Sequence, residues 1–149
     1  MNNTLHNSND FEGMRKAGNL AASTLDLLVE HVKPGVSTDE LDSVAFEFIT
    51  KNGGLIAPLF YKGFPKSICT SINHVICHGI PSSRILEEGD IVNIDVTVIV
   101  DGWHGDTSRM FPVGKINAKA QKLIDCTFES MHEGIKAAGP NSRLGDIGY

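Results

Sequence analysis

Hydrophobic residues recur every three or four positions through residues 14–32, which is the spacing of one face of an α-helix. A second helix is predicted to begin at Ser37, because Glu40 follows it in the spacing of a capping box, and to end at Gly53. The residues before the first helix are mostly polar, so we expect residues 1–10 to form a flexible N-terminal tail. The first third of the chain is therefore predicted to be helical.

The middle of the chain changes from helical spacing to an alternation of apolar and polar residues. Residues 67–80, 89–100 and 103–114 carry this alternation, and the last two segments flank Asp101–Gly102, which favours a two-residue hairpin turn. Residues 55–66 contain prolines and glycines and are predicted to be loop or sheet edge. Together the segments predict a mixed α/β (α+β) fold with a mainly antiparallel sheet covered by helices.

A third helix is predicted over residues 118–139, with Asn117 as its N-cap. Residues 140–149 look like the start of a further helix, and they are similar to residues 34–41, about 106 positions earlier. In both places a long amphipathic helix, a proline and a short turn precede a helix start. One such similarity does not by itself distinguish duplication from coincidence. Together with the early end of the last helix, it suggests an internal duplication whose second half is missing.

The predicted hairpin contains two aspartates, although aspartate is depleted in strands and costly on a half-buried surface. A two-residue turn at Asp101–Gly102 sets the register, with Thr97 opposite Asp106 and Asp95 opposite Ser108. Cross-strand partners share a face, as do residues two apart on one strand, so these four side chains should point the same way. The opposite face takes an unbroken apolar row, namely Val92, Ile94, Val96, Val98 and Val100.

Two ionised carboxylates this close repel each other, and in a partly dry cavity one of them is driven to hold a proton. A bound divalent cation removes the conflict, and carboxylate oxygens suit Mg²⁺, Mn²⁺, Fe²⁺ or Co²⁺. Asp95 and Asp106 are therefore candidate metal ligands. The alternative is that both aspartates are solvated, or that they pair with Arg109 and Lys115.

His78 is a second candidate for chemistry, because the segment CHGIP places it at a predicted strand end, where a side chain can face a cavity. The alternative is a purely structural histidine. A nucleophilic pair of Cys77 and His78 is disfavoured, because adjacent residues on a strand point to opposite faces. His104 can share the face of Asp106, but its place beside the hairpin turn predicts an exposed side chain.

The formal net charge of −5 argues against a broad electrostatic contact with nucleic acid or anionic lipid. No apolar run is long enough to cross a membrane, and the polar start of the chain does not resemble a secretory signal. The three cysteines are odd in number and show no C-x-x-C spacing, which favours free thiols in a reducing compartment. We therefore expect a cytoplasmic protein without nucleic-acid or membrane partners.

Two long motifs carry a family resemblance. The stretches FPKSICTSINHVICHGIP, from residue 64, and GDIVNIDVTVIVDGWHGDTSRMF, from residue 89, resemble the type I methionine aminopeptidases, metallopeptidases with the pita-bread fold. The resemblance covers about residues 11–149 and implies the N-terminal portion of the pita-bread catalytic domain, with the C-terminal half absent. In that fold two similar αβ halves surround a pseudo-twofold axis, which would explain the internal similarity.

The resemblance implies roles for the candidate residues. In that family the aspartate at the place of Asp95 chelates one metal ion and that at the place of Asp106 bridges two, so a complete site holds two divalent ions, of Co, Fe, Mn, Zn or Ni. His78 is implied to contact the substrate near the scissile amide and is the implied catalytic residue. Backbone oxygens of Asn73 and Val75 would bind a monovalent cation, Na⁺ or K⁺.

The implied activity is metal-assisted hydrolysis that removes the initiator methionine from nascent proteins. Tyr61, Phe64 and Cys69 would contribute to the methionine pocket. The implied substrates are the N-terminal methionine peptides of nascent chains. The ribosome is a candidate partner, and family members are usually monomeric.

The sequence departs from the family pattern in one large respect. The family's remaining metal ligands, a histidine and two glutamates that include the general base, lie in the second half of the domain, and no stretch of this chain supplies them. We therefore expect the 149-residue chain alone to be inactive. Two smaller departures are Lys62, where histidine is common, and His74, where an acidic residue is usual.

Two alternatives to a methionine aminopeptidase stay open on the sequence. A pita-bread module that has lost its metal centre would bind peptides, ribosomes or other proteins without catalysis. The other alternative is a different pita-bread enzyme, such as an X-Pro aminopeptidase or a creatine hydrolase. Those enzymes usually carry a large extra N-terminal domain, for which we expect no room in the eleven leading residues.

Overall fold

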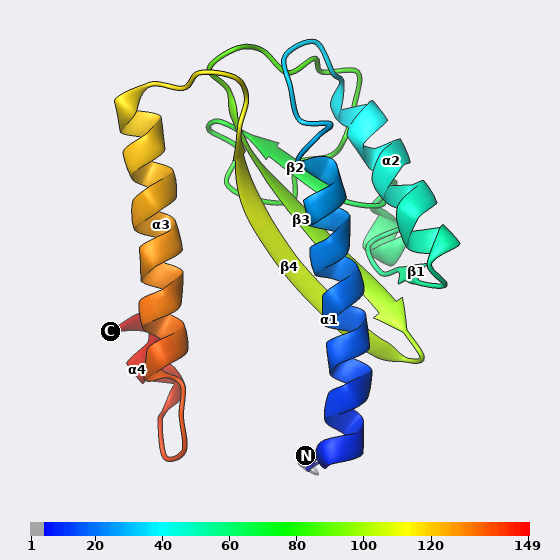
Figure 1. The fold of residues 1–149 in the computed structure, drawn as a ribbon, viewed down its shortest axis with the longest axis vertical. Coiled ribbons are helices and arrows are strands. Elements are labelled where there is room, and N and C mark those ends of the chain that lie inside the picture. Colours follow the sequence, from blue (N-terminus) through cyan, green and yellow to red (C-terminus); the bar gives the residue numbers. More distant parts are fainter. Residues whose placement is uncertain (1–4) are drawn as a thin grey trace. The chain divides into compact units, whose positions relative to one another are not determined.

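The structure, a computed structural model, describes residues 5–149 and divides into two units, with the boundary after Lys115 (Figure 1). The first unit contains the sheet and the first two α-helices, and the second contains the last two α-helices. In chain order the elements are α1 (Ser8–Leu28), α2 (Thr38–Lys51), β1 (Leu55–Ile56), a 3-10 turn (Tyr61–Gly63), β2 (Cys69–Ile72), β3 (Ile91–Val100), β4 (Trp103–Pro112), α3 (Ala118–Ala137) and α4 (Leu144–Gly148).

Helix α1 begins earlier than the hydrophobic pattern predicts. The side chain of Asn7 accepts a hydrogen bond from the N–H of Asn9 at 2.9 Å, and the N–H of Asn7 donates to the carboxylate of Asp10 at 2.8 Å. These contacts form a capping box that starts the helix. The prediction of a tail over residues 1–10 is therefore wrong at its last three positions, which are helical, while residues 1–4 lie outside the described part of the chain.

Helix α2 begins where the sequence predicts. The Ser37 hydroxyl accepts a hydrogen bond from the N–H of Glu40 at 3.2 Å, and the Glu40 carboxylate accepts one from the N–H of Ser37 at 2.7 Å. The predicted capping box is therefore confirmed. The helix ends at Lys51, two residues before Gly53, whose φ of 78° turns the chain away from the helix axis.

The four strands form one antiparallel sheet in which β3 is the central strand. Strand β4 pairs along the whole of one edge of β3, while β2 and β1 pair with successive parts of its other edge. The predicted hairpin register is confirmed, because Thr97 lies opposite Asp106 and Asp95 lies opposite Ser108. The strand predicted over residues 67–80 is shorter than expected, and only its beginning forms β2.

The strand prediction fails after Ile72 because the chain turns there. Asn73 has a left-handed φ of 52°. Its side-chain amide donates to the carboxylate of Asp90 at 2.7 Å, and its side-chain oxygen accepts from the N–H of Ile91 at 3.1 Å. These side-chain hydrogen bonds offer the backbone an alternative to a longer strand. Residues 73–80 are therefore irregular.

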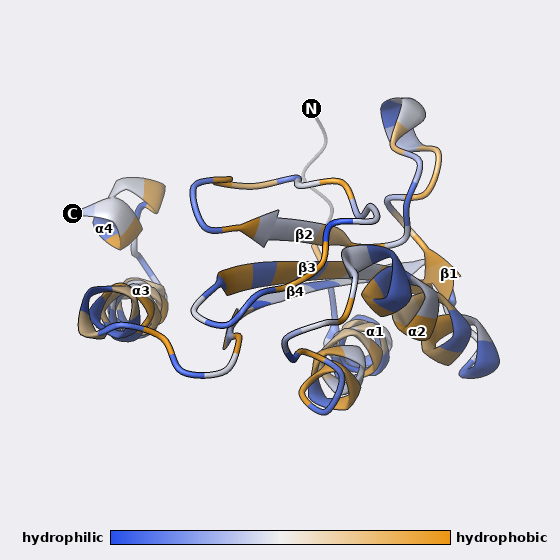
Figure 2. Ribbon diagram, turned by 90° about the horizontal axis from the view of Figure 1, so that it is seen from above, coloured by the Kyte–Doolittle hydropathy of each residue, from blue (hydrophilic) through white to orange (hydrophobic). Residues whose placement is uncertain are grey.

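Helices α1 and α2 lie on the same side of the sheet, and the core lies between them and β3 (Figure 2). The predicted apolar row on β3 faces this core, with these fully buried members: Val92, Ile94, Val96 and Val98. The helices contribute the following buried side chains: Ala21, Leu25, Leu28, Leu41, Ala45 and Ile49. The predicted mixed α/β architecture is therefore observed, and Asp95 and Asp106 lie on the opposite face of the sheet.

The second unit consists of α3 and α4. Asn117 caps α3 as predicted, because its side chain accepts a hydrogen bond from the N–H of Ala120 at 2.9 Å. Gly134 is the one buried residue of α3, and a Cβ at this position would lie 3.1 Å from the side chain of Ile147 in α4. Helix α3 leaves several apolar side chains exposed, namely Leu123, Phe128, Met131 and Ile135.

The internal similarity between residues 34–41 and 140–147 extends to the backbone. Gly35 and Asn141 occupy the same place in the two segments, and both have left-handed φ values, 92° and 72°. In each segment the N–H of the residue before the helix donates to a carboxylate three residues later, at 2.7 and 2.8 Å. The two segments share turn and cap geometry as well as sequence, which supports an internal duplication.

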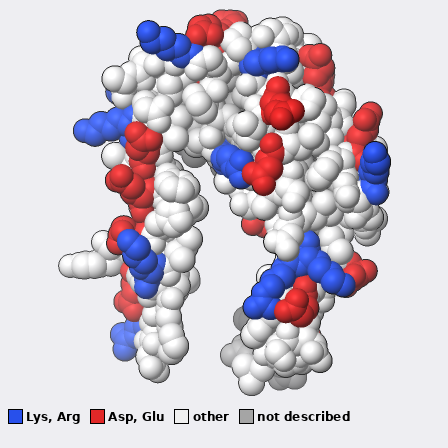
Figure 3. Space-filling model, in the orientation of Figure 1, with Lys and Arg blue, Asp and Glu red and all other residues white. Residues whose placement is uncertain are grey.

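Acidic and basic side chains are interspersed on the face of the molecule shown in Figure 3. Interspersed charges of both signs produce no extended electrostatic field of one sign over such a face. Among residues 5–149, no helix combines the length and the hydrophobicity that a membrane span requires.

Candidate active site

A cleft of about 850 Å³ opens on the face of the hairpin that carries the two aspartates. Its wall comes from four parts of the first unit: strands β3 and β4, residues 57–65, the start of β2, and the irregular segment after β2. The predicted metal, catalytic and methionine-pocket residues all line this cleft: Asp95, Asp106, His78, Tyr61, Phe64 and Cys69. The fold thus brings together candidate residues that are far apart in the sequence.

Asp95 and Asp106 line the cleft as diagonal neighbours on the hairpin. The Thr97 hydroxyl donates a hydrogen bond to Oδ1 of Asp106 at 3.0 Å. The pKa of Asp95 is raised above its ordinary value, first by burial and then by the neighbouring carboxylate of Asp106, while His78 acts to lower it. The pair therefore shows the like-charge conflict that the sequence predicts.

No basic side chain neutralises this pair through an ion pair within the described residues. Arg109 instead pairs with Asp26 of α1, at 2.8 Å. Lys115 contributes its backbone N–H to the carboxylate of Glu88 and forms no ion pair with either cleft aspartate. The alternative in which Arg109 and Lys115 balance the aspartates is therefore not the arrangement of this structure.

The two carboxylates fit a divalent cation as part of a ligand set. Both offer hard oxygen donors in the same cleft, and a cation between them would oppose the repulsion that raises the pKa of Asp95. Within residues 5–149, no group of three or more His, Cys, Asp or Glu side chains is placed to hold a metal ion. Asp95 and Asp106 therefore stay candidate ligands, and two carboxylates alone do not complete the coordination shell of a divalent cation.

His78 lies in the irregular segment after β2, and the prediction that it stands at a strand end is wrong. Its φ is 55°, a left-handed conformation that is uncommon outside glycine. Its side chain lines the cleft and lies near enough to Asp95 to affect the pKa of that carboxyl. Cys77 also lies outside a strand, so the alternation of side chains along a strand does not separate Cys77 from His78. The two residues are separated by the cleft instead, because His78 lines it and Cys77 does not.

Tyr61, Phe64 and Cys69 form much of the apolar part of the cleft wall. Cys69 is only 8% exposed, and burial, followed by the nearby charge of Asp95, raises the pKa of its thiol to about 11. Near neutral pH this thiol therefore behaves as a small apolar group. Lys62, with a left-handed φ of 48°, places its Nζ 5.4 Å from the centre of the Tyr61 ring.

Asn73 and Val75 line a separate, smaller cavity of about 250 Å³. Ile80 lines both cavities, so they lie on two sides of the same segment. The structure does not bring Asn73 and Val75 into the cleft of the aspartates. Their assignment to a monovalent cation stays a prediction.

Thr97 and His104 line the cleft, although the sequence assigned neither of them a role. The Thr97 hydroxyl donates a hydrogen bond to the carboxylate of Asp106. The predicted hairpin register already placed Thr97 opposite Asp106, and this contact could have been inferred from it. His104 is exposed, as predicted, and it also lines the cleft. Its position two residues before Asp106 on β4 was the signal for this placement.

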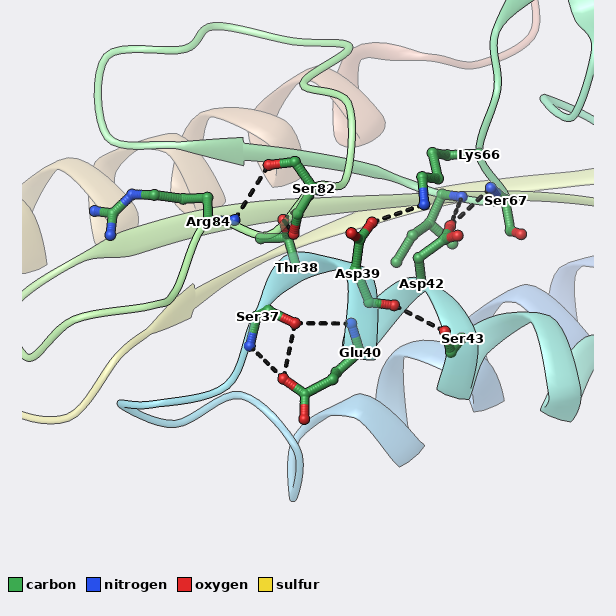
Figure 4. Close-up of polar contacts among 11 residues, drawn as sticks. Ser37, Thr38, Asp39, Glu40, Asp42, Ser43, Lys66, Ser67, Ser82 and Arg84 are labelled. Carbon is green, nitrogen blue, oxygen red and sulfur yellow. Dashed lines mark hydrogen bonds and ion pairs between the residues drawn. The ribbon is translucent and has the colours of Figure 1, made fainter.

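Side chains at the N-terminal end of α2 hold the segments that flank the cleft residues (Figure 4). The buried carboxylate of Asp42 accepts hydrogen bonds from the N–H groups of Ser67 and Ile68, at 2.7 and 3.1 Å. The Thr38 hydroxyl accepts from the N–H of Ser82 at 2.9 Å and donates to its carbonyl at 3.0 Å. No local sequence pattern predicts these contacts, because they join residues 25 to 44 positions apart.

A family model described as metallopeptidase family M24 matches residues 12–149. The methionine aminopeptidase of Rickettsia prowazekii is 57% identical over 145 residues, which are 97% of this chain and 56% of that protein. Methionine aminopeptidase A of Synechocystis is 53% identical over 146 residues, which are 97% of this chain and 58% of that protein. The chain thus spans about half the length of the curated relatives it matches.

Solved structures match the same fold. The crystal structure of the Rickettsia prowazekii methionine aminopeptidase has a TM-score of 0.97 at 57% identity, over 98% of this chain and 59% of that one. The Thermotoga maritima methionine aminopeptidase has a TM-score of 0.93 at 29% identity, over 97% of this chain and 58% of that one. A prolidase from Pyrococcus furiosus has a TM-score of 0.81 at 20% identity, over 96% of this chain and 41% of the prolidase chain. At this low identity the match is evidence for a shared fold only. These matches confirm the predicted pita-bread fold.

Proposed function

The chain belongs to metallopeptidase family M24, and from that premise we propose that it carries the first part of the catalytic site of a type I methionyl aminopeptidase. The reaction is the removal of the initiator methionine from nascent proteins. The observation that carries the proposal is the pair of Asp95 and Asp106 in one cleft with His78 and an apolar wall. The relatives named as methionine aminopeptidases support the same reaction.

Family M24 consists of metallopeptidases that use divalent metal ions. We propose that the complete site would hold two such ions, of Co, Fe, Mn, Zn or Ni, with Asp95 and Asp106 among the residues that hold them. When bound, they supply Lewis-acid activation of the first peptide carbonyl and of a water molecule. Within this chain, the Thr97 hydroxyl orients the carboxylate of Asp106 toward the cleft.

The remaining cleft residues bind and orient the substrate in this proposal. Tyr61, Phe64 and Cys69 receive the methionine side chain, and the protonated Cys69 thiol adds no charge to that apolar surface. His78, on the same cleft and close to Asp95, contacts the substrate at the scissile amide. Methionine recognition and bond cleavage then occupy adjoining parts of one cleft.

We extend the proposal to the setting of the reaction. The substrates are N-terminal methionine peptides of nascent chains, met at the ribosome by a monomeric enzyme in the cytoplasm. The unpaired cysteines and the net charge of −5 support a reducing compartment without nucleic-acid binding. A site for Na⁺ or K⁺ at the backbone oxygens of Asn73 and Val75 is a separate part of the proposal, supported by their place on one small cavity.

A second candidate function is a peptide-binding module without catalysis. One observation favours it: within the described residues, no third metal-ligating side chain joins Asp95 and Asp106. For the same reason we expect residues 1–149 alone to bind metal weakly and to be inactive. A missing outer contact to a ligand already costs about 10–100-fold in metal affinity, and missing ligands cost more.

The test compares residues 1–149 with the complete product of the same gene, each supplied with Co²⁺, Mn²⁺ or Fe²⁺ and a Met-Ala-Ser peptide. Release of methionine by the complete product, abolished by Asp106→Asn, would support the aminopeptidase. Asp101→Asn is the matched control, because Asp101 lies on the exposed turn of the same hairpin. Peptide binding without release of methionine would instead support the binding module, and full turnover of Asp106→Asn would contradict the metal assignment.

A further inference from the structure

His78 has a backbone conformation that its surroundings must maintain. Its φ of 55° lies in the left-handed region, which residues other than glycine adopt only at a cost. Such conformations persist where neighbouring contacts determine them, and they cluster at functional sites. In this chain those contacts are made by the next residue, Gly79.

Gly79 is held against β2 by two hydrogen bonds. The N–H of Thr70 donates to the carbonyl of Gly79 at 2.8 Å, and the N–H of Gly79 donates to the hydroxyl oxygen of Ser71 at 3.1 Å. A Cβ at position 79 would lie 2.1 Å from the Thr70 carbonyl oxygen, so only glycine permits this approach. The N–H of Gly79 belongs to the peptide that follows His78. Its hydrogen bond therefore fixes the ψ angle of His78.

Ser71 is a buried residue of β2, with 3% of its surface exposed. Its hydroxyl forms one hydrogen bond within the described residues, the one to Gly79. Its side chain does not line the cleft of the aspartates, so it does not itself contact a substrate there. A buried hydroxyl in this place meets the hydrogen-bonding need of the Gly79 N–H and stabilises the turn at His78.

The ends of the irregular segment are held independently of Ser71. Near its start, the N–H of Val75 donates to the carbonyl of Ile72 at 3.0 Å. Beyond its end, Ser82 and Thr38 exchange two hydrogen bonds. With both ends held, loss of the Ser71 contact frees only the part of the segment that carries His78.

We propose that Ser71 is a positioning residue for His78: through the N–H of Gly79, its hydroxyl holds His78 in the left-handed conformation that directs the imidazole into the cleft. The inference rests on the proposed function, in which His78 contacts the substrate. Without the hydroxyl, Gly79 keeps only its carbonyl contact with Thr70, so the peptide after His78 is held less tightly and the imidazole shifts from its productive position. The methionine pocket, made by Tyr61, Phe64 and Cys69, is unchanged.

The first test measures kcat and KM of the complete gene product with Ser71→Ala. A small displacement of a reacting group can cost about 100-fold in rate, so we expect kcat to fall about 10- to 100-fold. KM should change by less than about threefold, because ground-state binding is retained. Ser71→Thr keeps the hydroxyl and should restore most of kcat. Ser67→Ala is the matched control, because Ser67 is also buried but its hydroxyl forms no hydrogen bond within the described residues.

The second test is a double-mutant cycle with His78→Ala. If Ser71 acts through His78, adding Ser71→Ala to His78→Ala should lower kcat no further. A further loss of the same size on the His78→Ala background would overturn the inference and give Ser71 a general structural role. Amide hydrogen exchange gives a direct reading in the unsubstituted protein, where the Gly79 N–H should be protected. An unprotected Gly79 N–H would also overturn the inference, even if Ser71→Ala failed to fold.

The cycle also separates this inference from the function on which it rests. If His78→Ala lowers kcat and Ser71→Ala does not, the inference alone is wrong. If His78→Ala leaves kcat unchanged, the proposed role of His78 is wrong and the inference is overturned with it.

Discussion

Helices α1 and α3 have nearly the same length, 21 and 20 residues, and both are amphipathic, yet they bury very different surfaces. Helix α1 packs on β3 and β4 and buries Ala17, Ala21, Thr24, Leu25 and Leu28. Helix α3 buries Gly134 and exposes Leu123, Phe128, Met131 and Ile135. Amphipathic spacing therefore predicts a helix, but it does not show how much of its apolar face that helix buries.

The same difference separates the chemistry of the two units. The cleft belongs wholly to the first unit, where the hairpin puts an apolar row on one face and Asp95 and Asp106 on the other. Burial of the apolar face is the main source of stability, so the helices that cover it also fix the position of the aspartates. Four experiments test this contrast.

The largest effect should come from the buried face of α1. Leu25→Ala removes a side chain that is 1% exposed and should lower the free energy of unfolding by about 2–5 kcal/mol. Met131→Ala in α3, at a residue 48% exposed, should change it by no more than about 0.5 kcal/mol. Urea unfolding followed by the fluorescence of Trp103 measures both. Equal losses would show that α3 is buried against another surface in solution.

The next largest effect concerns turnover by the complete gene product. His78→Ala should lower kcat by about two to three orders of magnitude, the scale of losing one positioned transition-state contact. His132→Ala, the same substitution on α3, should leave kcat near its original value. Metal content, measured by elemental analysis, should be unchanged in both variants. Loss of metal in His78→Ala would mean that His78 is a metal ligand and not a substrate contact.

A third comparison uses the cysteines of the two units. A rise in the pKa of the Cys69 thiol from 9.0 to about 11 lowers its thiolate fraction about 100-fold at pH 8. Iodoacetamide should therefore modify Cys69 far more slowly than the exposed Cys126 of α3. Peptide mass spectrometry against time distinguishes the sites, with Cys69→Ser to confirm the assignment. Similar rates at the two cysteines would contradict the burial of Cys69.

The smallest effect should appear in the pH dependence of stability without metal. Burial, and then Asp106, raise the pKa of Asp95 in the folded chain, so the folded state holds this proton more tightly than the unfolded state. The stability contribution of Asp95 is therefore present at low pH and is lost as pH rises from the ordinary carboxyl pKa through the raised one. Asp106→Asn should reduce this loss, and Asp125→Asn in α3 should not. Thermal unfolding in the presence of a chelator, over a series of pH values, measures this loss of stability. If Asp106→Asn left the loss unchanged, the effect of Asp106 on the pKa of Asp95 would be contradicted.

The parts of the fold that were predictable from sequence depend on local rules. Asp101–Gly102 fixes a two-residue turn, and the period of two then places Asp95 and Asp106 on one face without further information. The capping boxes are equally local. Asn7 and Asp10 have the three-residue spacing of a capping box, but they lie outside the apolar pattern from which the helix was predicted. Hydrophobic spacing alone underestimates a helix whose first turn is polar.

The remaining parts depend on contacts between distant residues. The left-handed turn at His78 requires the approach of Gly79 to β2, and Ser67, just before β2, is held by Asp42 of α2, 25 positions away. No pattern within residues 73–80 contains this information, and the strand prediction failed there for that reason. Sequence identified His78 as a candidate, but only the fold shows how the residue is held.

The hairpin has a consequence for the order in which the site is built during synthesis. Its Thr97–Asp106 contact spans 9 residues, whereas the ion pair of Arg109 with Asp26 joins β4 to α1 across 83. Hairpins form in about 1–10 μs, while the ribosome adds about 5–20 residues per second. A hairpin alone is only marginally stable, but α1 and α2 precede it in the chain and are available to cover it. Asp95 and Asp106 should thus share a face as soon as the hairpin has left the ribosome, so the acidic pair is exposed to cellular metal ions early in folding.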